Sequence, residues 1–240
     1  TRARWQTAAA DNLGSAKRTW QLLRDAAPDS RHMRYVAGCQ PVTVVDYQFA
    51  DYDQPWLAGR KRLAFLATRR SGKARDMIAP GPDAAQLRDI IALALRTPDH
   101  GKLAPWRIIT IADDQRDALA MLLKDAWVAE NPGAAGLDLS ALDQFANQAP
   151  SLLVLVSTPV PGSKIPMWEQ QMSAGAVGMN LLHAAHALGF VGSWLTGWAA
   201  YSPDVAKAFG VADHDTIVGY FFLGTAGAVV AGRYAIQGLI

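Results

Sequence analysis

The stretch SLLVLVS at residues 151–157 is an uninterrupted run of leucine and valine between two serines. Such runs are typical of strands that are buried on both faces of a sheet. The chain then continues into a pattern of small and apolar residues at 168–188, and VGSWL follows at 191–195. We predict a central strand, a long closely packed helix and a short second strand in that order.

Similar patterns lie on both sides of this unit. Apolar, β-branched stretches predict strands at 106–111 (WRIITI) and 216–223 (TIVGYFFL). Apolar periodicity, capping residues and prolines predict helices in four places: a short one through Phe65 and Leu66 that ends near Arg70, one from Pro82-Asp83 to just before Thr97-Pro98, one at 113–128 and one at 203–209. The predicted fold class is α+β, with a central mixed or antiparallel sheet surrounded by helices.

The composition favours a folded globular protein and excludes several classes of function. Half of the 240 residues are hydrophobic, 18% are charged, and the net charge is +2, which predicts no attraction to nucleic acid. The single cysteine, Cys39, excludes an intrachain disulfide and a cysteine-rich metal site. Of the five histidines only His183 and His186 have a spacing that could suit a metal, with no carboxylate nearby, so we predict no metal. The first residues lack the apolar core of a secretory signal, and a reduced, cytoplasmic setting is expected.

Residues 170–203 contain no Asp, Glu, Lys or Arg, which raises the alternative of a membrane-interacting helix. Glutamine, asparagine and histidine interrupt this run, and it is rich in alanine and glycine. A buried central helix or an interface helix is the better interpretation, and no membrane partner is predicted. The chain as a whole divides into an N-terminal extension (1–58), a regular domain (59–225) and an apolar C-terminal tail (226–240).

Three polar clusters lie at the ends of predicted elements, while the sequence motifs of nucleotide-binding loops, hydrolase nucleophiles and zinc sites are absent. Arg69-Arg70-Ser71 offers two guanidinium groups and a hydroxyl, which suit a phosphate. The alternative is a solvated last helical turn. Arg96-Thr97-Pro98-Asp99-His100 follows a helix, and the alternative there is an ordinary turn. Gly192–Gly197 brackets a short strand with glycines, either for close approach to a ligand or as a core strand.

In this order the clusters resemble the nitroreductase family, specifically its shorter bacterial branch of NAD(P)H nitroreductases. The resemblance is carried by four collinear blocks that cover about two thirds of the chain: LATRRSGKA (66–74), LRTPDHGKLAPWRI (95–108), IPMWEQQMSAGAVGMNLLHAAHALGFVGSW (165–194) and IVGYFFLGT (217–225).

The resemblance implies an intertwined homodimer with FMN at the subunit interface. It implies that the ribityl phosphate lies among Arg69, Arg70 and Ser71, and that Arg96 and His100 reach FMN across the interface. The flavin would lie along Trp194, Leu195 and Thr196. NADH or NADPH would bind at the segment composed of Ala184, Ala185, His186, Ala187, Leu188 and Gly189. No protein residue is expected to be catalytic, because the flavin performs the chemistry.

The resulting prediction is an enzyme, an FMN-dependent oxidoreductase that passes hydride from NAD(P)H through the flavin to a small acceptor such as a nitroaromatic or a quinone. Three features depart from the family pattern: Leu195 stands where members often have Arg, about 60 residues precede the first block, and the tail lacks the usual prolines. Arg233 is therefore left out of the predicted site. The alternative function is a flavin-binding protein without turnover, used for storage or sensing.

Overall fold

The computed structural model describes residues 65–66, 69–133 and 139–227. Its sheet has five strands, all paired antiparallel: β1 (Met77–Ile78), β2 (Trp106–Ile111), β3 (Ser151–Ser157), β4 (Val191–Leu195) and β5 (Thr216–Ala226). The order is β1-β5-β3-β2, and β4 also pairs with β5. The strands β3 and β5 therefore form the centre, as the apolar run at 151–157 predicts.

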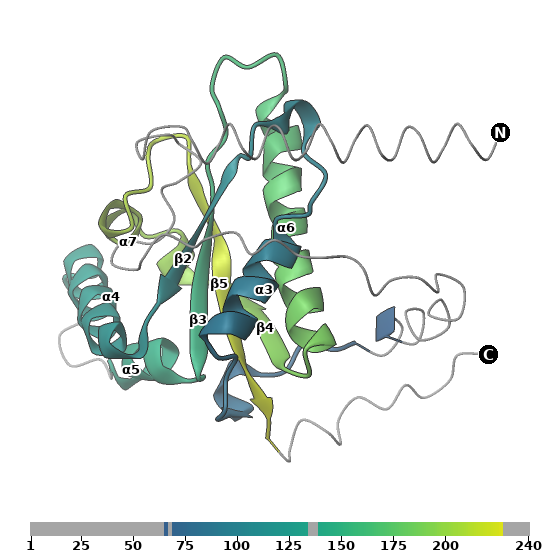
Figure 1. The fold of residues 1–240 in the computed structure, drawn as a ribbon. Coiled ribbons are helices and arrows are strands. Elements are labelled where there is room, and N and C mark those ends of the chain that lie inside the picture. Colours follow the sequence, from purple (N-terminus) through teal and green to yellow (C-terminus); the bar gives the residue numbers. More distant parts are fainter. Residues whose placement is uncertain (1–64, 67–68, 134–138, 228–240) are drawn as a thin grey trace, which may run out of the picture. The chain divides into compact units, whose positions relative to one another are not determined.

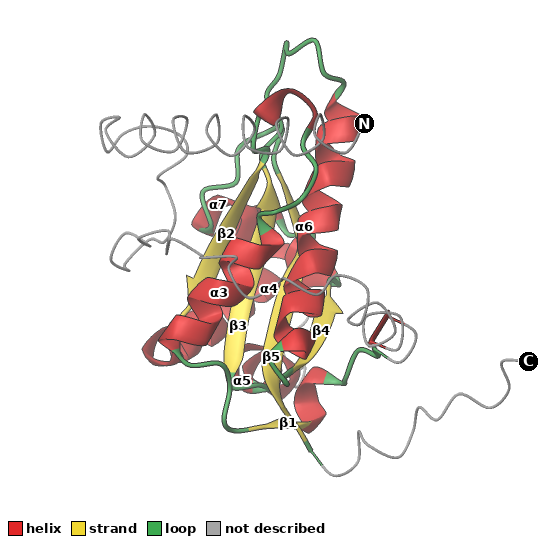
Figure 2. Ribbon diagram, turned by 45° about the vertical axis from the view of Figure 1, so that its right-hand side comes forward, coloured by secondary structure: helices red, strands yellow, loops and turns green. Residues whose placement is uncertain are grey.

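Helices cover both faces of this sheet, as Figures 1 and 2 show. The helices α4 (Arg116–Glu130), α5 (Ser140–Asn147) and α7 (Pro203–Ala208) lie on one face, and α3 (Ala84–Ala94) and α6 (Met167–Ala187) lie on the other. Both layers pack on alternating residues of the central strands. Leu152, Val154 and Phe222 belong to the core under α4 and α5, whereas Leu153, Leu155 and Phe221 belong to the core under α3 and α6. The α+β class with an antiparallel sheet is confirmed.

Local signals explain where the elements begin. The Asp83 side chain accepts hydrogen bonds from the Ala85 and Gln86 amides, and the Asp83 amide donates one to Gln86 Oε1, so α3 starts with a capping box. Ser202 caps α7 through the Val205 amide. The strands predicted at 106–111, 151–157 and 191–195 are confirmed with the same bounds. Two elements were not predicted, α5 and the two-residue β1.

Within the described ranges, no helix is long and apolar enough to cross a membrane. No group of three or more His, Cys, Asp and Glu side chains there could hold a metal ion. The predictions for the extension at 1–58 and for nearly all of the tail at 226–240, with Cys39 and Arg233, lie outside the described residues.

Candidate functional site

The first candidate cluster, Arg69-Arg70-Ser71, lies in a loop fixed at several main-chain points. The Arg69 amide donates to the Phe65 carbonyl (2.8 Å), which closes a helical turn. The Gly72 amide donates to the Gly192 carbonyl (3.2 Å), which attaches the loop to β4. The Arg70 carbonyl accepts a hydrogen bond from Nε2 of His186 on α6 (2.8 Å). The loop is thus held between the C-terminal end of α6 and the start of β4.

Arg69 carries the feature that most clearly points to a ligand. Its Nη1 is buried and forms no hydrogen bond within the described part of the chain. A buried donor without an acceptor is costly, and a guanidinium group with free donors is suited to phosphate oxygens. Burial, followed by the positive charges of Arg69 and His186, lowers the pKa of His183 on α6. The neighbourhood therefore disfavours further positive charge and suits an anion.

The segment predicted to accept NAD(P)H spans the end of α6. Ala184 and Ala185 are buried in the core, whereas Ala187, Leu188 and Gly189 are exposed. The two ring nitrogens of His186 both face main-chain carbonyls, Nδ1 that of Leu182 (2.7 Å) and Nε2 that of Arg70 (2.8 Å). In this structure the His186 ring therefore supports the arginine loop, and the exposed surface of the segment comes from its last three residues.

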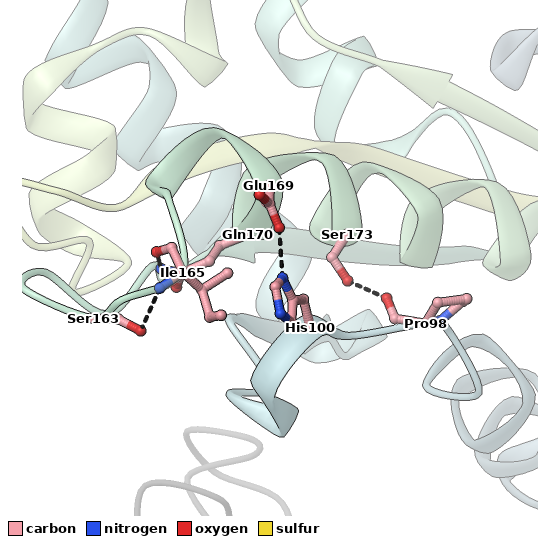
Figure 3. Close-up of polar contacts among 7 residues, drawn as sticks. All are labelled: Pro98, His100, Ser163, Ile165, Glu169, Gln170 and Ser173. Atoms are coloured by element: carbon pink, nitrogen blue, oxygen red, sulfur yellow. Dashed lines mark hydrogen bonds and ion pairs between the residues drawn. The ribbon is translucent and has the colours of Figure 1, made fainter.

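The second candidate cluster, Arg96 to His100, is attached along α6, between Glu169 in its first turn and Asn180 beyond its middle. Ser173 Oγ donates to the Pro98 carbonyl (2.5 Å), and Asn180 Nδ2 donates to Thr97 Oγ1 (2.8 Å). His100 Nδ1 lies 2.7 Å from Glu169 Oε2. Figure 3 shows the Glu169 and Ser173 side chains of α6 facing His100 and Pro98 of the loop. The Arg96 and His100 side chains are exposed at the protein surface.

The third candidate cluster, Trp194, Leu195 and Thr196, ends β4. The Trp194 indole Nε1 donates to the Val218 carbonyl (3.0 Å), and the ring packs on Phe221 with centroids 5.0 Å apart. Glycines provide the space for this ring. A Cβ at Gly219 would lie 2.5 Å from Trp194 Cδ1, and one at Gly178 would lie 3.2 Å from the same indole. Leu195 is partly buried opposite Tyr220, and Thr196 is exposed.

The arginine loop is attached through Gly72 and Gly192 to the start of β4, the strand that ends in the third cluster. The Arg96–His100 loop runs along α6, from Asn180, which binds Thr97, to Glu169 near the N-terminal end of the helix, which binds His100. The short helical turn that begins at His100 lies at the end of α6 opposite to the arginine loop, as Figures 1 and 2 show. Glu169 and His186, which hold the two loops, are 17 residues apart on the helix, or about 25 Å at 1.5 Å per residue. A single subunit therefore does not bring His100 to Arg69.

The α6 residues that hold the Arg96–His100 loop were not predicted as functional. Glu169, Ser173 and Asn180 contact a loop about 70 to 80 positions earlier. Gln170 is buried and bridges the main chain of Val160 and Ile165. The signal for Glu169, Gln170 and Ser173 in the sequence is their place in the WEQQMS stretch at 168–173, and Asn180 lies outside it. Such long-range partners leave no local pattern.

An antiparallel sheet with helices on both faces and cationic loops at both ends of its longest helix defines an α+β protein suited to an anionic ligand. Comparison with known proteins gives the family. Residues 66–225 match the Nitroreductase family. YdjA of Escherichia coli (strain K12), which is named an NAD(P)H nitroreductase, is 37% identical over 166 residues, which cover 68% of this chain and 87% of YdjA.

Solved structures with 19% identity share the fold. The match to a nitroreductase-like family protein from Bacillus cereus has a TM-score of 0.60. It covers 74% of this chain and 89% of the Bacillus chain. The match to a variant of the FMN- and NADPH-dependent nitroreductase NfnB from Sphigopyxis sp. strain HMH has a TM-score of 0.54. It covers 74% of this chain and 94% of the NfnB chain. The chain belongs to the nitroreductase family and is an oxidoreductase.

Proposed function

We propose that two copies of this chain hold FMN at their interface, accept hydride from NADH or NADPH, and reduce a small acceptor such as a nitroaromatic or a quinone. The observation that carries the proposal is the buried Nη1 of Arg69, which has no hydrogen-bond partner within the described residues. Ser71, whose side chain is exposed, follows two positions later in the same loop. The names of the relatives support the choice of cofactors, since YdjA is named for NAD(P)H and NfnB for FMN and NADPH.

In this proposal each cluster has a distinct task. Arg69, Arg70 and Ser71 would hold the phosphate of FMN, and Trp194, Leu195 and Thr196 would lie along its ring system. The exposed residues Ala187, Leu188 and Gly189 would contact the nicotinamide nucleotide, with Ala184, Ala185 and His186 behind them. Arg96 would stabilise negative charge on the ring, and His100 would contact the ring from the other subunit. When bound, FMN supplies the transfer of hydride between nicotinamide and acceptor.

The geometry of α6 supports a homodimer. Glu169, which binds His100, and His186, which binds the Arg70 carbonyl, lie about 25 Å apart along the helix axis. Arg69 and His100 would therefore meet at one ligand if they came from different subunits. The helix also exposes large apolar side chains, Trp168 at 64% and Met172 at 63%, which a partner subunit would cover.

The first test is the cofactor content of the purified protein. We expect a yellow protein whose flavin absorbance is bleached by NADH or NADPH under argon and restored by a nitroaromatic or a quinone. A colourless protein that does not take up added FMN would refute the proposal.

The phosphate assignment is tested by replacing Arg69 and Ser71 together with alanine. Each hydrogen bond to a charged group is worth about 1.5–3 kcal/mol, so the Kd for FMN should rise at least about tenfold. Fluorescence titration of the apoprotein measures this Kd. Lys207→Ala, which removes an exposed charge on α7, is the control and should leave it unchanged. Equal FMN affinity in the double variant and the wild type would contradict the assignment.

A second candidate function, flavin binding without turnover, is motivated by Leu195. This residue is partly buried and uncharged. The resemblance to the family implies that an arginine often stands at this position, so a charge beside the proposed flavin would be missing. The same bleaching experiment separates the two functions, because a storage or sensing protein would be yellow and yet unreactive towards both NADH and NADPH.

A further inference from the structure

The loop of residues 99–104 has an unusual main chain. Gly101 has φ 79°, Lys102 has φ 55° and Ala104 has φ 46°. Residues other than glycine rarely adopt positive φ, and they do so where the surrounding structure imposes it, often at functional sites. Here the Asp99 carboxylate accepts a hydrogen bond from the Ala104 amide (2.6 Å), and Ser173 holds the Pro98 carbonyl. A hydrogen bond within the loop and another from α6 thus hold the loop in a conformation that costs free energy.

We propose that Glu169 is the positioning residue for His100. It fixes the imidazole ring with Nδ1–H directed at the carboxylate and leaves Nε2 for FMN. The inference rests on the proposed function, in which His100 lies against FMN bound mainly by the partner subunit.

The contact between His100 and Glu169 determines which ring nitrogen of His100 remains available to a ligand. An ionised carboxylate only accepts hydrogen bonds, so the nitrogen 2.7 Å from Glu169 Oε2 must carry a proton. The neutral His100 ring then has its lone pair on Nε2. Figure 3 shows the second ring nitrogen on the side of the ring away from Glu169. His100 would therefore present Nε2 as an acceptor when neutral and as a donor when protonated.

Stabilisation of the fold does not account for this pair. The side chains of His100 and Glu169 are 66% and 30% exposed, and ion pairs at such positions contribute little to folding stability. Restricting a ring to one orientation and one tautomer has a larger effect on a ligand that must meet one particular nitrogen.

The experiment compares Glu169→Gln, Glu169→Ala and His100→Ala with the wild type. The first measurement is the ¹⁵N chemical shifts of the histidine rings, with His100 assigned from the His100→Ala spectrum. We expect the Nδ1-protonated tautomer of neutral His100 in the wild type and a mixture of both tautomers in Glu169→Gln.

The second measurement is the Kd for FMN of the apoprotein. Glu169→Ala should weaken binding roughly tenfold, about the worth of one charged hydrogen bond. It should have no additional effect in a His100→Ala background, because Glu169 acts through His100. The control is Asp143→Asn, which breaks the exposed Lys124–Asp143 pair (2.5 Å) and should change neither the Kd nor the His100 spectrum.

The outcomes separate this inference from the proposed function. If the wild type binds FMN and Glu169→Ala binds it equally well, the positioning role is refuted and the proposed function stands. An additional loss in the His100→Ala background, or an unchanged tautomer in Glu169→Gln, would also refute it. If the wild type does not bind FMN, the proposed function fails, and with it the role of His100 at the flavin.

Discussion

Arg69 and His183 form an electrostatic pair whose coupling can be measured without any ligand. The pKa of His183 is lowered first by burial and then by the positive charge of Arg69, with His186 adding to the effect. Both causes favour the neutral imidazole, so His183 should titrate below the ordinary value of about 6.5.

The prediction at this scale is that Arg69→Ala raises the pKa of His183 towards its ordinary value. The rise should be partial, because burial, the larger cause, remains. A ¹H NMR titration of the histidine ring protons measures it, and Lys207→Ala provides the control. A pKa of His183 that does not move in Arg69→Ala would mean that the guanidinium group does not face this ring in solution.

The site could be predicted from the sequence only in part. The arginine and serine side chains of the arginine loop suggested a phosphate site because the chemistry of a side chain follows from its residue type. The tertiary hydrogen-bond partners of these residues could not be predicted. Nothing near Arg70 in the sequence indicates that its carbonyl binds His186, which lies 116 positions away. The proposed roles of the site residues themselves remain predictions.

At the scale of elements, the helices and strands that could be predicted are those with a long or unambiguous pattern of apolar residues. The strand at 151–157 is buried on both faces and reads as one apolar run, and α6 is long enough for its small residues to show. The eight-residue α5 follows a stretch of sequence rich in glycine and alanine, and its few apolar residues form too short a pattern. The two-residue β1 exists only through its pairing with the end of β5, so no local signal marks it.

The packing of Trp194 of β4 against β5 requires that residue 219 have no side chain, and this residue is a glycine. Gly219→Ala would place a methyl group 2.5 Å from Trp194 Cδ1 and 2.9 Å from the Leu195 carbonyl oxygen. Forced overpacking of this kind costs about 1–3 kcal/mol, so we expect the free energy of unfolding to fall by that amount. Urea denaturation measures it. Gly133→Ala is the matched control, since a Cβ there meets nothing within 4 Å. Equal stability of Gly219→Ala and the wild type would mean that the indole can move at little cost.

At the scale of the whole molecule, the central prediction is self-association through α6. Met172→Glu would place a charge in the proposed interface and should weaken the dimer by about 2 kcal/mol or more, some 30-fold in Kd. Light scattering after gel filtration measures the mass, and bound flavin should be lost together with the dimer. Met121→Glu on α4 is a closely matched control, because both methionines are 63% exposed. Dissociation by both variants or by neither would contradict the assignment of the interface.

The placement of the two loops at opposite ends of α6 has a consequence for genetic complementation. If FMN is shared across the interface, each helix serves two different cofactors, one at each end. A subunit with Arg69→Ala and Ser71→Ala, paired with a subunit carrying His100→Ala, would then have both defects in one site and none in the other. Such a mixed dimer, isolated with two different tags, should regain one tightly bound flavin per pair although each parent binds it poorly.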